Sequence, residues 1–315
     1  MSTKSEVREI LVVSLSNLGD VILTTPVMTA LREFYPKAFI SVVIGPKAEC
    51  LLRGSQTIDK VIIYDKKKLN LFGKLQFVGE LRKRPYDLVI DLRNTLIPYL
   101  VKARQTSSPF NRPKATAMRE RHLEHLRAFQ ISIGKGKFHF FSEQEARSSR
   151  EKLFQNGISW EGGFVVIAPG AGNYFKRWPV EYFKEVAGYF LSRGKQVIVV
   201  GSEDEKNLGE AMQNHSGKPA NLCGAFSLRE LAAVLHDADL VLCCDSGIMH
   251  LANELNAPVT ALFGPTNENQ YAKFGPYNRV IKKELPEVSK QDSMKQIPVR
   301  DVIQACEELL SAEIH

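Results

Sequence analysis

Short apolar segments rich in Val and Ile recur along the chain and alternate with segments of helical periodicity. Nearly continuous apolar strands are typical of a parallel sheet that helices cover on both faces. Strands of this kind are expected at residues 10–14, 39–44, 61–64, 88–92, 164–168, 196–200, 240–244 and 259–263. Because half of them fall in each half of the chain, the alternation predicts an α/β protein with two doubly wound, Rossmann-like parallel sheets.

Helices are expected between these strands, over residues 20–34, 143–155, 180–193, 203–212, 227–236 and 299–312. A chain of 315 residues suggests two domains. We expect an N-terminal domain over residues 1–157 and a C-terminal domain over residues 158–296. The remaining segment, 297–315, is a candidate to cross back onto the N-terminal domain.

The chain has no apolar run long enough to span a bilayer, and its N-terminus lacks the apolar core of a secretion signal. Its five cysteines form no CxxC pair, which is typical of buried thiols in a reducing compartment. These features predict a cytoplasmic protein.

The net charge of +7 is concentrated in one segment, since residues 102–137 contain nine Lys or Arg and two acidic residues. Such a segment suits an acidic substrate, an anionic membrane surface or nucleic acid, or it is simply a solvated basic loop. Few aromatic residues accompany the charge, which disfavours base stacking and therefore a nucleic-acid partner.

A turn of sequence Ser-Asn-Leu-Gly follows the first expected strand and leads into a helix near Asp20. Open α/β sheets bind ligands at the carboxyl ends of their strands. Asp20 is therefore a candidate functional carboxylate, with a simple helix-capping role as the alternative. The segment lacks a GxGxxG pattern, which disfavours a dinucleotide oxidoreductase.

Two further turns follow the first two strands of the second half. Residues 169–172, Pro-Gly-Ala-Gly, precede Lys176 and a Trp-Pro pair that can open a helix. Exposed backbone N–H groups and a lysine beside a helix N-terminus suit a phosphate, although a plain surface loop is the alternative. Acidic residues 203–205 follow Gly201 and suit either ribose hydroxyl groups or the positive end of a helix.

The most specific segment covers residues 240–271. A buried strand ends in Asp245-Ser246-Gly247, a helix begins at once, and His250 lies in its first turn. This turn can offer backbone N–H groups and a hydroxyl to a pyrophosphate. The next strand ends in Phe-Gly-Pro-Thr, residues 263–266. His250 is either part of this site or a buried structural histidine.

Taken together and in this order, these segments resemble the ADP-heptose:lipopolysaccharide heptosyltransferases, glycosyltransferase family 9. The Gly-Asp turn, the Pro-Gly-Ala-Gly segment with its Lys and Trp-Pro, and the Asp-Ser-Gly-x-x-His turn followed by Phe-Gly-Pro-Thr carry the resemblance. It covers nearly the whole chain and is weakest over residues 93–141 and in the C-terminal tail.

The resemblance implies a GT-B fold in which two Rossmann-like domains face a cleft. It implies an inverting, metal-independent transfer of L-glycero-D-manno-heptose from its ADP donor to the lipopolysaccharide inner core, a Kdo–lipid A or heptosyl acceptor. No cofactor is implied, and no DxD metal motif ends a strand. The partners would be an ADP-sugar, an anionic glycolipid and, peripherally, the inner face of the cytoplasmic membrane.

By position, the resemblance assigns Asp20 as the catalytic base. It assigns donor-binding roles to Asn17, Gly172, Lys176, Glu205, Phe226, Asp245, Ser246, Gly247, Ile248 and His250. The family's Thr-Thr is replaced here by Ala-Gly at residues 171 and 172, which removes two hydroxyl groups. Arg93, Arg104 and Arg112 are candidates for contacts with the acceptor, because arginine binds carboxylates and phosphates through two parallel hydrogen bonds.

Three alternatives remain. The chain could belong to the same family and use another nucleotide-sugar or acceptor. It could be a sugar-nucleotide epimerase or a dehydrogenase on a similar architecture, against which the missing GxGxxG pattern speaks. It could be a non-catalytic module that reads lipid head groups or nucleic acid through its basic segment.

Overall fold

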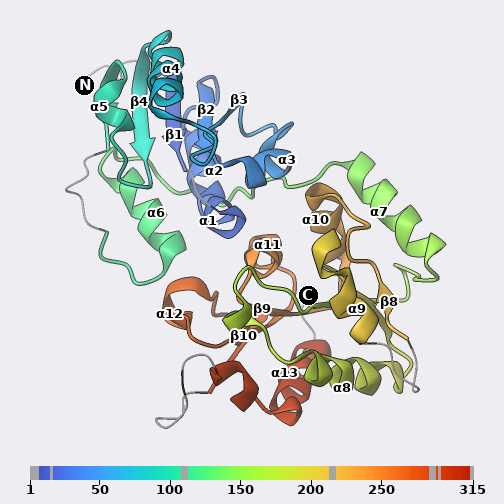
Figure 1. The fold of residues 1–315 in the computed structure, drawn as a ribbon. Coiled ribbons are helices and arrows are strands. Elements are labelled where there is room, and N and C mark those ends of the chain that lie inside the picture. Colours follow the sequence, from blue (N-terminus) through green and yellow to red (C-terminus); the bar gives the residue numbers. More distant parts are fainter. Residues whose placement is uncertain are drawn as a thin grey trace. The chain divides into compact units, whose positions relative to one another are not determined.

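The computed structural model describes residues 7–14, 17–107, 113–212, 218–283, 289 and 292–312. The chain divides into two compact units, Met1–Phe140 and Phe141–His315. Each unit is built on one sheet of parallel strands with helices packed around it (Figure 1). The expected α/β class with two doubly wound parallel sheets is therefore confirmed.

The first unit has a five-stranded sheet in the order β3-β2-β1-β4-β5. Its strands are β1 (Glu9–Val13), β2 (Phe39–Ile44), β3 (Lys60–Ile63), β4 (Tyr86–Asp91) and β5 (Ala103–Thr106). Its helices are α1 (Leu18–Ile22), α2 (Thr25–Phe34), α3 (Glu49–Leu52), α4 (Leu71–Arg82), α5 (Ile97–Leu100) and α6 (Met118–Arg127). The central strand β1 pairs with β2 on one side and β4 on the other. The strand order reverses between β1 and β4, where such sheets bind ligands.

The second unit has a six-stranded sheet in the order β11-β10-β9-β6-β7-β8. Its strands are β6 (Phe164–Ala168), β7 (Gln196–Val199), β8 (Ala220–Asn221), β9 (Leu240–Cys244), β10 (Val259–Phe263) and β11 (Asn278–Lys282). Its helices are α7 (Glu143–Gln155), α8 (Val180–Leu191), α9 (Lys206–Ala211), α10 (Leu228–Asp237), α11 (Gly247–Leu255), α12 (Glu268–Tyr271) and α13 (Val299–Ser311). Here the order reverses between β6 and β9.

All the strands expected from the sequence are present. The expected bounds are found for β2, β6, β9 and β10. Three strands were missed, β5, β8 and β11, because they lie towards the sheet edges and keep their residues partly exposed. The basic segment 102–137, for which a solvated loop was one alternative, contains β5 and α6.

The single helix expected over residues 20–34 is two helices, α1 and α2. Thr24 lies between them and donates its hydroxyl to the Val21 carbonyl at 2.7 Å. Pro26 follows in the first turn of α2. Proline lacks an amide hydrogen and is tolerated only at the start of a helix, so it begins a new one here.

The boundary between the units lies after Phe140, earlier than the expected residue 157. The reason is that α7 packs against α10. Arg150 donates to Asp237 from Nε and Nη2 at 3.0 and 2.9 Å, and Lys152 lies 2.8 Å from Glu230. These contacts place α7 in the second unit.

Helix α13 also belongs to the second unit, whereas the sequence suggested a separate segment that crosses back. Its apolar side, with Val302, Cys306 and Leu309, is buried in the core that α8 and β9 also form. Just before the helix, the Ile297 carbonyl accepts a hydrogen bond from the Trp178 indole at 3.1 Å.

Among the described residues, no helix is long and apolar enough to cross a membrane. Four cysteines are buried, and burial raises the pKa of Cys244 and of Cys306 to about 12. Cys50 is exposed, contrary to the expectation that the thiols are buried.

Candidate functional site

The strand-order reversal of the second unit brings two of the predicted turns together. Strand β6 ends at Ala168 and leads into residues 169–172, and β9 ends at Cys244 and leads into Asp245. The two strands are paired, with Ala168 opposite Cys243. Their loops therefore leave the same edge of the sheet side by side.

The loop after β6 is anchored so that Lys176 has a defined position. Asn173 accepts a hydrogen bond from the Phe175 amide at 3.0 Å and starts a short turn over Tyr174–Lys176. Trp178 is buried, and its backbone N–H donates to Cys244 Sγ at 3.5 Å. Lys176 thus lies between a capped turn and a buried aromatic anchor.

Lys176, Asp245 and Thr266 form one interaction centre. The Lys176 ammonium and the Thr266 hydroxyl both donate to Asp245 Oδ2, at 2.8 and 2.6 Å. Asp245 is 4% exposed, so removing either partner would leave a buried carboxylate poorly compensated. An ammonium group has three N–H donors. Among the described residues, Asp245 is the hydrogen-bond partner found for it, which leaves donors for a ligand.

Helix α11 begins next to this centre. Ser246 is its N-cap residue, with an extended backbone, but its side chain makes no capping hydrogen bond. The buried Ser246 Oγ has no hydrogen-bond partner within the described part of the chain. Backbone N–H groups from Gly247 onwards point out of the helix start, and the helix dipole favours negative charge there. A buried, unsatisfied hydroxyl at such a helix start indicates a ligand with acceptor oxygens.

The other predicted residues of α11 lie in its first turn. Ile248 is half-buried. His250 is buried, and its ring centre lies 6.4 Å from that of Tyr271. The structure therefore places His250 in the wall of this region rather than on its open surface.

Glu205 joins the turns that follow β6 and β7. Its Oε2 accepts hydrogen bonds from the Ser202 amide and hydroxyl, at 2.9 and 3.0 Å, in a capping box. Its Oε1 lies 3.7 Å from Arg177. A Cβ atom at Gly170 would lie 2.0 Å from Oε1, so any other residue there would displace this carboxylate from its present position. Glu205 thus takes part in helix capping, which was the alternative to ribose binding for this acidic cluster.

Gly172 and Phe226 complete the predicted donor residues. Gly172 is exposed, and a Cβ atom there would meet nothing within 4 Å. Phe226 is half-buried just before α10, with the Lys152 ammonium 5.9 Å from its ring centre. Within the described part of the chain, neither residue forms a hydrogen bond or ion pair with Asp245.

In the first unit, the turns after β1 and β4 bring Asp20 and Arg93 together. Asp20 lies in the first turn of α1, and its Oδ1 is 4.0 Å from Arg93 Nη1. Both side chains are partly exposed. The turn that carries Arg93 is held by the buried Asp91, which accepts from the amides of Arg93 and Thr95 at 2.9 and 2.5 Å.

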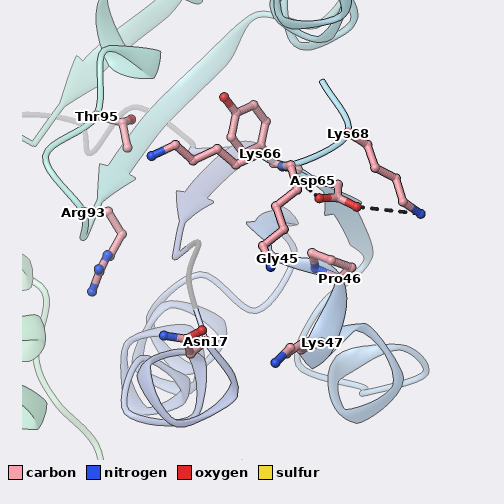
Figure 2. A pocket seen from close by; sticks show the side chains of 11 residues that line it. Asn17, Gly45, Pro46, Lys47, Asp65, Lys66, Lys68, Arg93 and Thr95 are labelled. Atoms are coloured by element: carbon pink, nitrogen blue, oxygen red, sulfur yellow. Dashed lines mark hydrogen bonds and ion pairs between the residues drawn. The ribbon is translucent and has the colours of Figure 1, made fainter. Parts of the chain in front are cut away.

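A basic cavity of about 530 Å³ lies at this edge of the first sheet. It is lined by Asn17, Lys47, Thr95, Arg93 and the lysines at 66–68, with Asp65 as its single acidic residue (Figure 2). Lys68 pairs with Asp65 at 3.8 Å. Asn17, to which the resemblance gives a donor-binding role, lies in the first unit and lines this cavity. The excess of positive charge suits an anionic ligand.

Of the three arginines expected to contact an acceptor, Arg93 lines the cavity. Arg104 lies near the start of the edge strand β5, whose first residue Ala103 is opposite Tyr86 at the start of β4. It is exposed at the end of the sheet away from Asp20, so the structure does not bring it together with Arg93. Arg112 lies outside the described residues.

Two histidines of α6 were missed by the sequence reasoning. His122 and His125 are both buried. Neither His122 Nε2 nor His125 Nδ1 has a hydrogen-bond partner in the region the structure describes. Burial, helped by His125, Arg93 and Arg121, lowers the pKa of His122 to about 4. The spacing of two histidines by one helical turn in a basic helix was the available signal.

Comparisons with known proteins agree with this geometry. Residues 75–298 match the family model described as "Glycosyltransferase family 9 (heptosyltransferase)". The chain belongs to glycosyltransferase family 9. Lipopolysaccharide heptosyltransferase 3 of Escherichia coli is 26% identical over 93% of this chain and 96% of its own length. The resemblance drawn from the motifs is confirmed.

Solved structures of this family have the same fold. A family 9 glycosyl transferase from Veillonella parvula covers 98% of this chain and 99% of its own, with a TM-score of 0.84 and 25% identity. E. coli ADP-heptose lps heptosyltransferase II covers 96% of this chain and 98% of its own, with a TM-score of 0.77 and 23% identity. The GT-B class is therefore shown for this family 9 member. The family match begins at residue 75 and does not include Asp20.

The Thr266 contact gives a prediction about stability. Thr266→Val removes the hydroxyl that donates to buried Asp245, so we expect the free energy of unfolding to fall by about 1–3 kcal/mol. Thr266→Ser keeps a hydroxyl and should retain most of the stability. Urea unfolding of the three proteins measures this. Equal stability of the Val and Ser variants would show that the contact contributes nothing.

The buried His122 gives a prediction about pH. The folded chain keeps this ring neutral down to about pH 4, whereas the unfolded chain protonates it below its usual 6.5. Acid therefore favours the unfolded state, and stability falls between pH 6.5 and 4 by up to about 3 kcal/mol from this group. Unfolding of His122→Gln, measured across this range, should show a shallower decline than the wild type. His139→Gln, at an exposed position of the same unit, should follow the wild type.

Proposed function

We propose that this chain transfers a heptose from an ADP-heptose donor to the inner core of lipopolysaccharide. The observation that carries the proposal is the centre at Asp245, where Lys176 and Thr266 hold a buried carboxylate next to the unsatisfied Ser246 hydroxyl. The named relatives support the choice of sugar, since the curated sequences are lipopolysaccharide heptosyltransferases. An E. coli relative of the same fold was solved with ADP, at a TM-score of 0.75 and 20% identity.

The donor diphosphate would bind at the N-terminus of α11. Lys176 keeps N–H donors for its oxygens, and Ser246 Oγ and the first amides of α11 supply neutral donors. Glu205 would bind the ribose, because a carboxylate has more lone pairs than its contacts with Ser202 use. Phe226 is proposed beside the adenine, with Gly172, Ile248 and His250 lining the donor site.

The chemistry would be an inverting displacement. The acceptor hydroxyl oxygen forms a bond to the anomeric carbon as the bond from that carbon to the diphosphate oxygen breaks. Asp20 takes the hydroxyl proton, and ADP leaves with the electron pair. Lys176 and the N–H groups of α11 would stabilise the charge that develops on ADP, so this route assigns no role to a metal ion. Asp20 is partly exposed, and its Oδ1 lies 4.0 Å from Arg93 Nη1.

The acceptor would bind in the basic cavity of the first unit. Its lysines and Arg93 match the carboxylates and phosphates of a lipopolysaccharide core. Such an acceptor is anchored in a bilayer by lipid chains. The proposed enzyme therefore works in the cytoplasm, in peripheral contact with the inner face of the cytoplasmic membrane.

The role of Asp20 is tested by Asp20→Asn. This variant keeps the shape of the side chain but cannot accept the proton, so we expect kcat to fall by about 10²–10⁴. Release of ADP measures turnover, and calorimetric titration with ADP should give an unchanged affinity. Glu49→Gln, at a partly exposed position in the same unit, should leave both unaltered. Normal turnover by Asp20→Asn would rule out this residue as the base.

The cavity is tested by Lys47→Ala. Loss of one positive charge should raise KM for the acceptor by about tenfold, with kcat and KM for the donor nearly unchanged. Lys37→Ala is the matched control, since Lys37 is exposed just before β2 and thus near the opposite end of the strands. A control that raises the acceptor KM as strongly would show a general charge effect instead of a site.

The donor is tested by thermal unfolding with ADP, UDP and GDP. A ligand that binds only the folded state stabilises it by about 2.7 kcal/mol at 100 times its Kd. ADP should raise the melting temperature by several degrees, and UDP and GDP by less at equal concentration. Selective stabilisation by UDP or GDP would favour a family member with another nucleotide-sugar donor.

A further inference from the structure

Helices α4 and α5 of the first unit present large apolar side chains to solvent. Leu71, Phe72, Leu75, Leu96 and Tyr99 are between 60% and 76% exposed, and Leu100 is 37% exposed. The two helices contact each other and lie together in Figure 1. We call these six residues the α4–α5 face. Contiguous exposed apolar side chains are uncommon on a protein surface and mark an interaction site.

The α4–α5 face is not needed for the core beneath it. Phe77, Leu81 and Ile97, on the inner side of the same helices, pack against the sheet with Val13 and Val89. A helix that only covers a sheet has polar residues on its outer side. Here α4 also carries exposed apolar residues on its outer side, which are available to a partner.

Positive charge is concentrated in α4 and in the segment that precedes it. Residues 65–84 contain seven Lys or Arg and two acidic residues. Lys74 stands between Phe72 and Leu75 in the sequence, and Lys66, Lys67 and Lys74 form no ion pair within the described residues. Exposed Leu and Phe with lysines close by in the chain match the boundary between acyl chains and anionic head groups.

We propose that the α4–α5 face docks the protein onto an anionic lipid bilayer. Leu71, Phe72 and Leu75 enter the head-group region, and the neighbouring lysines contact lipid phosphates. A second copy of the chain is a poorer occupant, because a symmetric contact would bring the same positive charge against itself. The positive charge of these lysines thus favours an anionic bilayer as the partner.

The docking face adjoins the basic cavity. The lysines at 66–68 line the cavity and lead into α4, and Thr95 lines it and precedes Leu96 of the face. The docking proposal rests on the proposed function in one respect. A lipid-anchored acceptor would explain why the docking face lies beside the cavity. An acceptor held in the bilayer would then have its charged sugars beside Arg93 without leaving the membrane.

The test is co-sedimentation of the full chain with vesicles. One set contains phosphatidylcholine alone, and the other an equal mixture of phosphatidylcholine and phosphatidylglycerol. We expect binding to the mixed vesicles that weakens in high salt. The triple variant Leu71→Ser, Phe72→Ser, Leu75→Ser should bind them at least about tenfold more weakly, because its apolar contacts are lost. Melting curves verify that the variant is folded.

The matched control is Phe154→Ser, which removes an apolar side chain that is 78% exposed on α7 of the second unit. It should bind vesicles like the wild type. Equal binding by the triple variant, absence of wild-type binding, or equal binding to neutral vesicles would overturn the proposal. A change in oligomeric state by light scattering, in the triple variant alone, would show that the face contacts a second copy.

Transfer to a water-soluble, delipidated acceptor separates the two proposals. The triple variant should perform this transfer at the wild-type rate, since none of its changed residues lines the cavity. Vesicle binding without any transfer would contradict the proposed function and leave the docking face standing. Transfer without vesicle binding would contradict the docking face and leave the proposed function standing.

Discussion

The candidate site of the second unit depends on the hydrogen bonds that the buried carboxylate of Asp245 accepts. Asp245 follows β9, and it accepts hydrogen bonds from Lys176, which follows β6, and from Thr266, which follows β10. Three neighbouring strand ends are thereby joined at one oxygen atom. A carboxylate at 4% exposure is stable only with such partners, so the same contacts that compensate its burial also fix the direction of the lysine.

The first unit follows the same topological rule with different side chains. Its strand order reverses between β1 and β4, and the turns after these strands carry Asp20 and Arg93. A helix start with donors suits phosphates in the second unit, whereas a partly exposed carboxylate beside a basic cavity suits a hydroxyl on an anionic molecule in the first. Each unit thus has a candidate site of its own at its strand-order reversal, and the two sites differ in charge.

The strands and turns that could be predicted were those with strong local signals. β6 and β9 are fully buried, so every residue is apolar and the pattern was plain. Helix α4 was missed because apolar residues lie on both its sides, which hides the helical period. The domain boundary was predicted too late in the chain. The sequence of α7 is polar, and it does not reveal that its side chains pair with residues of α10, in Arg150–Asp237 and Lys152–Glu230.

The sequence by itself determined the two parallel sheets, the four turns that carry the candidate site residues and the family to which the chain belongs. Each of these depends on neighbouring residues, through apolar runs, glycines and helix starts. Only the tertiary structure decided that Thr266 serves Asp245, that Arg93 but not Arg104 lies beside Asp20, and that lysines from separate segments share one cavity. The physical reason is that these contacts join strand ends distant in the chain, and sheet order, which no local pattern encodes, sets which ends are adjacent.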